Sequence, residues 1–139
     1  MVNLEKVIEG LEMVDDITDC YYNPETDEIF LSNIGEVENL SEDEIEELFE
    51  KSIILPTKYE INEYQMMVDF IETIENKEIK DNLQRLIQGK GAFRRFKDYC
   101  LEINIIKDWY DFKEQKYKEI AIDWCEQNEL KYKVSCKKI

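Results

Sequence analysis

The first thirty residues change from a helical to a strand-like pattern of apolar and polar positions. Four apolar residues spaced three and four apart predict a helix over residues 2–13: they are Leu4, Val7, Ile8 and Leu11. Residues 19–32 then place strand-like segments at 20–22 and 29–31 around the turn sequence N-P-E-T-D, which predicts a β-hairpin. Within this turn we expect Asp27 to adopt a left-handed backbone conformation.

The following segment combines a helix-capping motif with a short apolar run. We expect a loop over residues 34–40. Ser41 and Glu44 then match a capping box, so a helix is predicted to begin at Glu42. Residues 52–57 have the composition of a short strand that ends at a proline.

Helical spacing dominates the second half of the chain. Helices are expected over residues 60–75, 79–88 and 106–128, and another beginning near Gly91, with Gly89 at the C′ position of the helix before it. Leu130 to Cys136 alternates apolar and polar residues, which predicts a final strand that joins the hairpin sheet. The aromatic residues expected in the core are Phe70, Phe93, Phe96, Trp109, Phe112 and Trp124.

Together these elements predict an α+β fold in a single domain over residues 1–139. A small antiparallel sheet, made of the hairpin and one or two short strands, is expected to pack beside a bundle of five or six helices. The chain has only 4 Gly and 2 Pro, which argues against a sandwich with many tight turns.

Charge is distributed very unevenly along the chain. Residues 1–78 hold 4 Lys or Arg and 23 Asp or Glu, a net charge of −19, whereas residues 79–139 hold 14 and 10, a net charge of +4. Such an acidic chain should be repelled by bulk nucleic acid and by anionic membranes. No apolar run approaches the length of a membrane span, and the first residues do not resemble a secretory signal. We therefore expect a cytoplasmic protein with no membrane partner and with reduced cysteines.

The residue inventory argues against several classes of enzyme. The chain has no histidine, which removes the commonest general base and an adaptable metal ligand. It also has no phosphate-binding loop, no dinucleotide-binding glycine motif and no calcium-loop spacing. With 33 Asp and Glu, a carboxylate pair for hydrolysis is not excluded but is uninformative. An enzyme is not the leading hypothesis, and we expect no catalytic residues, no metal and no cofactor.

The helix beginning at Glu42 carries a run of acids on its polar face. The five candidate residues of this acidic face are Glu42, Asp43, Glu46, Glu47 and Glu50. A solvated helix surface is the ordinary explanation of such a run. The alternatives are a magnesium site or, over residues 36–50, an imitation of nucleic acid that occupies a basic groove on another protein.

One short basic stretch is the main candidate for a ligand or partner site. The sequence G-K-G-A-F-R-R-F-K-D, residues 89–98, places two glycines at a tight elbow and four cations around it. The candidate residues are Gly89, Lys90, Gly91, Arg94, Arg95 and Lys97. Two alternatives stay open: the cations form a site for an anion, or Arg95 and its neighbours hold the acidic first half of the chain through ion pairs.

The same stretch also resembles a known family. G-K-G-A-F-R-R-F-K-D at 89–98, followed by W-Y-D-F at 109–112 and A-I-D-W-C at 121–125, resembles uncharacterised protein family 0158. Asp27 stands where the family favours Gly, and Cys125 where it favours Leu. The resemblance implies a small bacterial cytosolic α+β protein. It implies no activity, so no functional residue is transferred.

Three functional hypotheses follow. The first is a non-enzymatic interaction or regulatory protein whose elbow over residues 89–97 contacts an acidic partner or a phosphate-bearing ligand. The second is contact with RNA or another nucleic acid, and it is not favoured because the two elbow phenylalanines are expected to be buried. Its cations would be Lys90, Arg94, Lys97, Lys113, Lys116 and Lys118. The third is the acidic mimic over residues 36–50, which would inhibit a basic protein.

Overall fold

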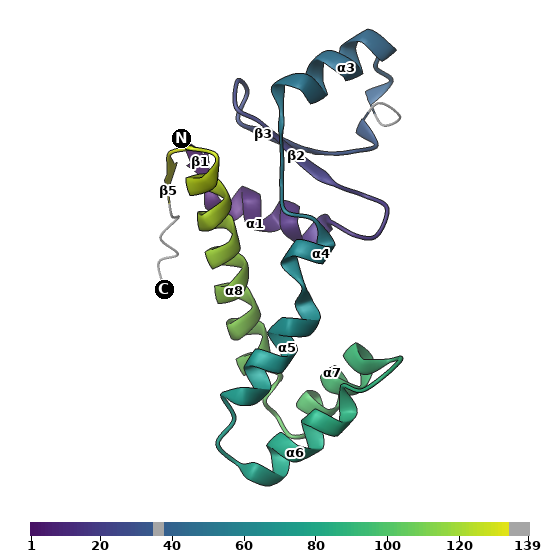
Figure 1. The fold of residues 1–139 in the computed structure, drawn as a ribbon, viewed down its shortest axis with the longest axis vertical. Coiled ribbons are helices and arrows are strands. Elements are labelled where there is room, and N and C mark those ends of the chain that lie inside the picture. The colour runs from purple at the N-terminus through teal and green to yellow at the C-terminus, as the bar shows by residue number, and fades with distance from the viewer. Residues whose placement is uncertain (35–37, 134–139) are drawn as a thin grey trace. The chain divides into compact units, whose positions relative to one another are not determined.

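The computed structural model describes residues 1–34 and 38–133 (Figure 1). The fold is α+β: it combines helices with a small three-stranded antiparallel sheet, as predicted. The chain divides into two compact units, Met1–Ile61 with Tyr117–Ile139 and Asn62–Lys116, which are described separately below. The expectation of one domain over the whole chain stays a prediction.

The three-stranded sheet of the first unit contains the predicted hairpin. Strands β2 (Cys20–Asn23), β3 (Glu28–Leu31) and β4 (Ile53–Ile54) are antiparallel in the order β3-β2-β4. The turn between β2 and β3 needs one residue with positive φ, and Asp27 supplies it at 61°. The Tyr22 hydroxyl donates to Asp27 Oδ1 at 2.8 Å, which ties the turn to β2.

Helix α1 (Leu4–Met13) packs closely on this sheet. Leu4, Val7 and Leu11 are buried, in agreement with the predicted face. At Gly10, a Cβ atom would lie 3.0 Å from both Cys20 Sγ and Leu55 Cδ2. The helix therefore approaches the strands through the one position that carries no side chain.

The prediction for the C-terminal strand is wrong in its partner. Strand β5 (Tyr132–Lys133) pairs in parallel with β1 (Val2–Asn3) and does not join the hairpin sheet. The Val2 amide donates to the Lys131 carbonyl at 2.7 Å. A strand needs backbone hydrogen-bonding partners, and for β5 the first strand of the chain, β1, provides them. Leu130 and Lys131, at the start of the predicted strand, precede β5, and residues 134–136 lie outside the described residues.

Helix α3 (Glu42–Lys51) follows the hairpin and begins where the capping box predicts. The Ser41 hydroxyl accepts from the Glu44 amide, and the Glu44 carboxylate accepts from the Ser41 amide. The expected loop over residues 34–40 is partly wrong, because Ile34 and Glu38 have helical backbone. Asn39 follows with φ of 55°, a left-handed conformation that commonly ends helices.

The first unit is completed by α4 (Lys58–Ile61) and by the second part of α8 (Ile106–Gln127). Ala121, Trp124 and Cys125 of α8 are buried. The Trp124 indole donates from Nε1 to the Ile54 carbonyl at 2.8 Å, and its ring lies edge-on to Tyr22 with the centroids 5.8 Å apart. This hydrogen bond satisfies the only polar group of the buried indole.

The second unit is helical. It contains α5 (Glu63–Glu72), α6 (Lys77–Leu86), α7 (Ala92–Glu102) and the first part of α8. Phe70, Phe96 and Trp109 form the centre of its core, with ring centroids 4.9–6.1 Å apart in edge-to-face geometry. Phe112 extends this cluster at 5.4 Å from Phe70 but is only half-buried.

Phe93 does not belong to this core, contrary to the prediction. Its side chain is 38% exposed, whereas Phe96 is fully buried. The buried face of α7 is formed by Ala92, Phe96 and Cys100, which follow one another at four-residue intervals. Phe93 lies at the edge of this face, so its aromatic ring reaches the surface of the unit.

Candidate functional site

The elbow between α6 and α7 depends on two glycines in left-handed conformations. Helix α6 ends with its C-cap at Ile87, so Gly89 lies one position beyond the predicted C′, with φ of 75°. Gly91 has φ of 78° and is the N-cap of α7, where no side chain caps the helix. Non-glycine residues at these two angles would be strained.

The Arg95 side chain links the end of α6 to the elbow through hydrogen bonds. Its guanidinium donates from Nε to the Leu86 carbonyl at 2.9 Å, from Nη2 to the Gln88 carbonyl at 2.6 Å, and from Nη1 to the Lys90 carbonyl. These three carbonyls lie at the end of α6 and in the elbow, where the helix leaves its last acceptors unpaired. In this structure the donors of Arg95 are directed to backbone oxygens. Ion pairs between the elbow and the acidic first half of the chain stay a prediction.

Gly91 leaves room for the Arg95 guanidinium. A Cβ atom at Gly91 would lie 3.0 Å from Arg95 Nη1. The absence of a side chain at this position lets the guanidinium reach the Lys90 carbonyl. The sequence G-K-G-A-F-R-R thus contains both a cluster of cations and an arginine that stabilises the backbone of the elbow.

The remaining cations of the elbow have little ion-pair compensation among the described residues. Arg94 is 88% exposed at its side chain and lies 4.0 Å from Asp98, at the outer limit of an ion pair. Among the described residues, no carboxylate lies within that distance of Lys90 or Lys97. At about 100° per residue, Phe93, Arg94 and Lys97 share one side of α7. We call this side the outer face of α7.

A groove lies between α6 and α7, on another side of α7 than the outer face. It is open to solvent, has a volume of about 510 Å³, and is lined by Asn82, Arg85, Leu86, Gln88, Lys90, Arg95 and Tyr99. The lining includes three cations and no carboxylate. The structure therefore divides the predicted site: Lys90 and Arg95 line the groove, whereas Arg94 and Lys97 do not.

The sequence analysis did not single out Asn82, Arg85 or Tyr99, three polar residues that line the groove. Asn82 donates from Nδ2 to the Tyr99 hydroxyl oxygen at 3.0 Å and accepts a hydrogen bond from Arg85 Nη2. Residues 82–97 carry five Lys or Arg and no Asp or Glu, although Asp81 and Asp98 flank the stretch. This gap in the acids is a sequence signal that extends the basic segment back to Arg85.

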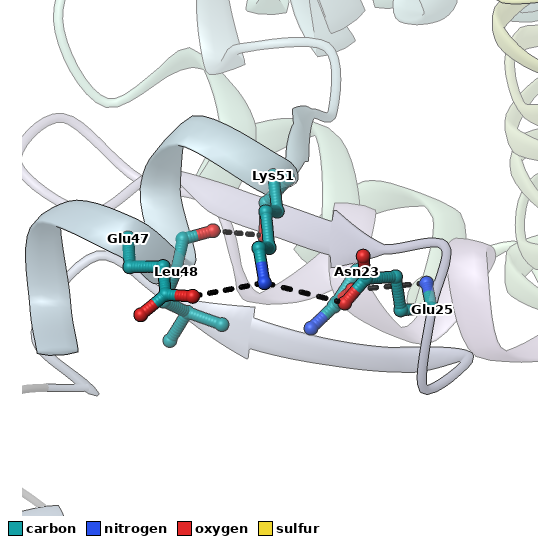
Figure 2. Close-up of polar contacts among 6 residues, drawn as sticks. Asn23, Glu25, Glu47, Leu48 and Lys51 are labelled. Carbon is teal, nitrogen blue, oxygen red and sulfur yellow. Dashed lines mark hydrogen bonds and ion pairs between the residues drawn. The ribbon is translucent and has the colours of Figure 1, made fainter.

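The acidic face of α3 is exposed as predicted. Its members Glu42, Asp43, Glu46, Glu47 and Glu50 all lie at the surface. Figure 2 shows how Lys51 ties this helix to the hairpin turn: its ammonium lies 2.9 Å from Glu47 and 3.7 Å from Glu25. Glu36, the start of the proposed mimic, lies outside the described residues. Mimicry of nucleic acid therefore stays a prediction.

Two of the α8 lysines proposed for nucleic-acid contact make internal contacts. Lys113 pairs with Glu63 at 3.3 Å, and the Lys116 ammonium lies 5.3 Å from the centre of the Phe112 ring. Lys118 is half-buried. Internal contacts therefore engage Lys113 and Lys116, two of the cations on which nucleic-acid binding would depend.

The described cysteines are buried thiols. Burial raises the pKa of Cys20, Cys100 and Cys125 to about 11, so each is protonated at neutral pH. Within residues 1–34 and 38–133, no group of three or more Cys, Asp or Glu side chains is arranged to hold a metal ion. None of the helices described there is long and apolar enough to cross a bilayer.

Comparison with known proteins gives a family without an assigned function. The model of an uncharacterised protein family, UPF0158, matches residues 1–137. A UPF0158 protein of Pseudomonas aeruginosa is 29% identical over 66 residues, which are 47% of this chain and 43% of the relative. The chain thus matches less than half the length of that relative. No solved structure matches the chain.

Proposed function

The chain belongs to the uncharacterised family UPF0158, and from that premise we propose that it is a non-enzymatic interaction protein whose basic elbow contacts an acidic protein partner. The contact surface consists of Lys90 together with the outer face of α7, which is formed by Phe93, Arg94 and Lys97. Arg95 has a different part in this proposal, because it shapes the elbow that presents the other cations.

The observation that carries the proposal is a set of uncompensated cations on an acidic chain. Arg94 is 88% exposed and weakly paired, and Lys90 and Lys97 have no carboxylate within 4.0 Å among the described residues. The net charge of −15 does not prevent a local contact. Charges are screened over about 8 Å at physiological salt, so a partner at the elbow senses mainly the nearby cations.

A mixed aromatic and cationic surface also supports a second candidate, contact with single-stranded RNA. Phe93 is exposed, and an aromatic ring beside Arg94 and Lys97 suits stacking of a base. Against it, Lys113 and Lys116 of α8 are engaged within the unit. A footprint limited to the elbow offers few phosphate contacts, which favours the protein partner.

The experiment compares capture of partners from native lysate by three full-length proteins. They are the wild type, Arg94→Glu/Lys97→Glu, and the control Lys6→Glu/Lys77→Glu. Both variants lower the net charge by the same amount, and all four lysines and arginines lie at least partly at the surface. Each capture is performed with and without nuclease, and the fold is checked by circular dichroism.

We expect wild type and control to retain one acidic protein that Arg94→Glu/Lys97→Glu loses, with no effect of nuclease. If nuclease removes the bound material, RNA replaces the protein partner. If the two variants and the wild type capture the same material, the outer face of α7 is not a contact surface and the proposal fails.

A further inference from the structure

We propose that the groove between α6 and α7 binds a phosphomonoester group, with Arg85, Lys90 and Tyr99 as its donors. This inference goes beyond the contact on the outer face of α7. It uses Arg85, Asn82 and Tyr99, to which the proposed function assigns no part. The two proposals share Lys90, and neither requires the other.

Arg85 determines which atoms donate and which accept in the two hydrogen bonds of the Asn82 side chain. A guanidinium only donates, so the oxygen of the Asn82 amide must face Arg85 and its nitrogen must face Tyr99. The Tyr99 hydroxyl oxygen therefore acts as an acceptor toward Asn82. Its own proton is left to donate to a third group.

Asn82 thus orients two donors at once. It holds one Nη2 hydrogen of Arg85, and a guanidinium has four further N–H groups. It also fixes the position of the Tyr99 oxygen at 3.0 Å from its amide nitrogen. Both side chains line the same groove, so they can address one ligand.

Arg95 lines the groove, and its guanidinium is hydrogen-bonded to backbone carbonyls rather than to a carboxylate. Its three hydrogen bonds go to the carbonyls of Leu86, Gln88 and Lys90, which are neutral groups. The positive charge of Arg95 therefore remains in the wall of the groove. With Arg85 and Lys90 it gives three cations, and no carboxylate of the described residues lies within 4.0 Å of any of them.

This set of groups suits a phosphomonoester better than a carboxylate. A phosphomonoester carries up to two negative charges and three acceptor oxygens, which an arginine fork, a lysine and a hydroxyl can share. The groove is open rather than enclosed, so recognition depends on charge and hydrogen bonds. Leu86 provides apolar surface beside the polar groups for the carbon atoms of the ester.

The test is a titration of the full-length protein, followed by backbone amide shifts in two-dimensional NMR. The probes are inorganic phosphate, glycerol 3-phosphate and the peptide acetyl-Ala-phosphoSer-Ala-amide, each against sodium chloride at equal ionic strength. The two esters separate the sources of the phosphate, because a small metabolite and a modified protein share the same group. The variants are Arg85→Gln and Tyr99→Phe, with Arg94→Gln as the matched control outside the groove.

We expect phosphate and at least one ester to shift the amides of residues 82–99, and chloride to leave them unchanged. Arg85→Gln should weaken binding at least tenfold and Tyr99→Phe several-fold, whereas Arg94→Gln should retain it. Tighter binding of the peptide would assign the site to phosphorylated proteins, and tighter binding of glycerol 3-phosphate to small metabolites.

The inference is overturned if chloride produces the same shifts, or if Arg85→Gln binds phosphate as tightly as the wild type. It is also overturned if Arg94→Gln alone abolishes binding, since that would place the anion on the outer face of α7. Loss of partner capture by Arg94→Glu/Lys97→Glu tests the other proposal and leaves this one unaffected.

Discussion

At the scale of single residues, two adjacent arginines perform different tasks. Arg95 directs three donors to backbone carbonyls of the elbow, whereas Arg94 extends into solvent at 88% exposure. Sequence spacing places them on different sides of α7, but it does not indicate that a guanidinium can cap the end of the preceding helix. The sequence therefore locates the basic elbow. The structure adds that Arg95 stabilises its backbone, whereas Arg94 lies at its surface.

Replacement of Arg95 by Lys should destabilise the protein by about 2 kcal/mol, because a single ammonium cannot satisfy three carbonyls that the planar guanidinium reaches together. Arg94→Lys is the matched control and should change the free energy of unfolding by less than about 0.5 kcal/mol. Urea unfolding measures both. Equal stability of the two variants would contradict the role given to Arg95.

Gly10→Ala should also destabilise the protein, by about 1–2 kcal/mol, although alanine is the better helix former. The added Cβ would lie 3.0 Å from Cys20 Sγ and from Leu55 Cδ2, inside a closely packed contact. The double variant Gly10→Ala/Cys20→Ala should recover part of the loss in a double-mutant cycle. A stabilising effect of Gly10→Ala would show that α1 does not approach the sheet so closely.

At the scale of elements, sequence patterns predicted the features that depend on neighbouring residues. The hairpin, its left-handed Asp27 and the capping box at Ser41 all depend on residues close in sequence. The partner of β5 and the exposure of Phe93 depend on contacts distant in sequence, which spacing alone does not contain. The groove is not evident from the sequence for the same reason, since Arg85 and Tyr99 line one groove only when α6 and α7 pack together.

Ser41→Ala should weaken α3 by about 1 kcal/mol, because the helix loses the acceptor of its capping box. Hydrogen exchange of the α3 amides should accelerate more than that of α5 or α7. Ser41→Asp keeps an acceptor at the same position and should restore protection. Unchanged exchange in Ser41→Ala would mean that the capping box contributes nothing to the helix.

At the scale of the whole molecule, charge and burial set the response to pH. The free-thiol pKa of 9.0 rises to about 11 at Cys20, Cys100 and Cys125 because burial disfavours the thiolate. Above pH 9 the unfolded chain releases these protons while the native chain keeps them. Stability from this source is therefore fully present below pH 9 and is lost as the pH rises towards 11.

The free energy of unfolding should accordingly fall between about pH 9 and pH 10, a window that lies below the ordinary lysine pKa of about 10.4. The pKa of Tyr22, raised to about 12 by burial and by its bond to Asp27, adds a further loss from pH 10 upwards. Cys100→Ala removes one thiol and should show a shallower fall. A flat profile for the wild type across this window would contradict the buried, protonated thiols.

We propose that the outer face of α7 contacts a partner, and photo-crosslinking in living cells detects such a contact at a single residue. The photoreactive p-benzoylphenylalanine would replace Phe93, which is 38% exposed on that face, or Tyr110, a 50% exposed aromatic of the same unit. We predict one crosslinked acidic protein from position 93, none from position 110, and loss of the product in Arg94→Glu/Lys97→Glu. Products that are equal at both positions, or that survive the charge reversal, would contradict the account.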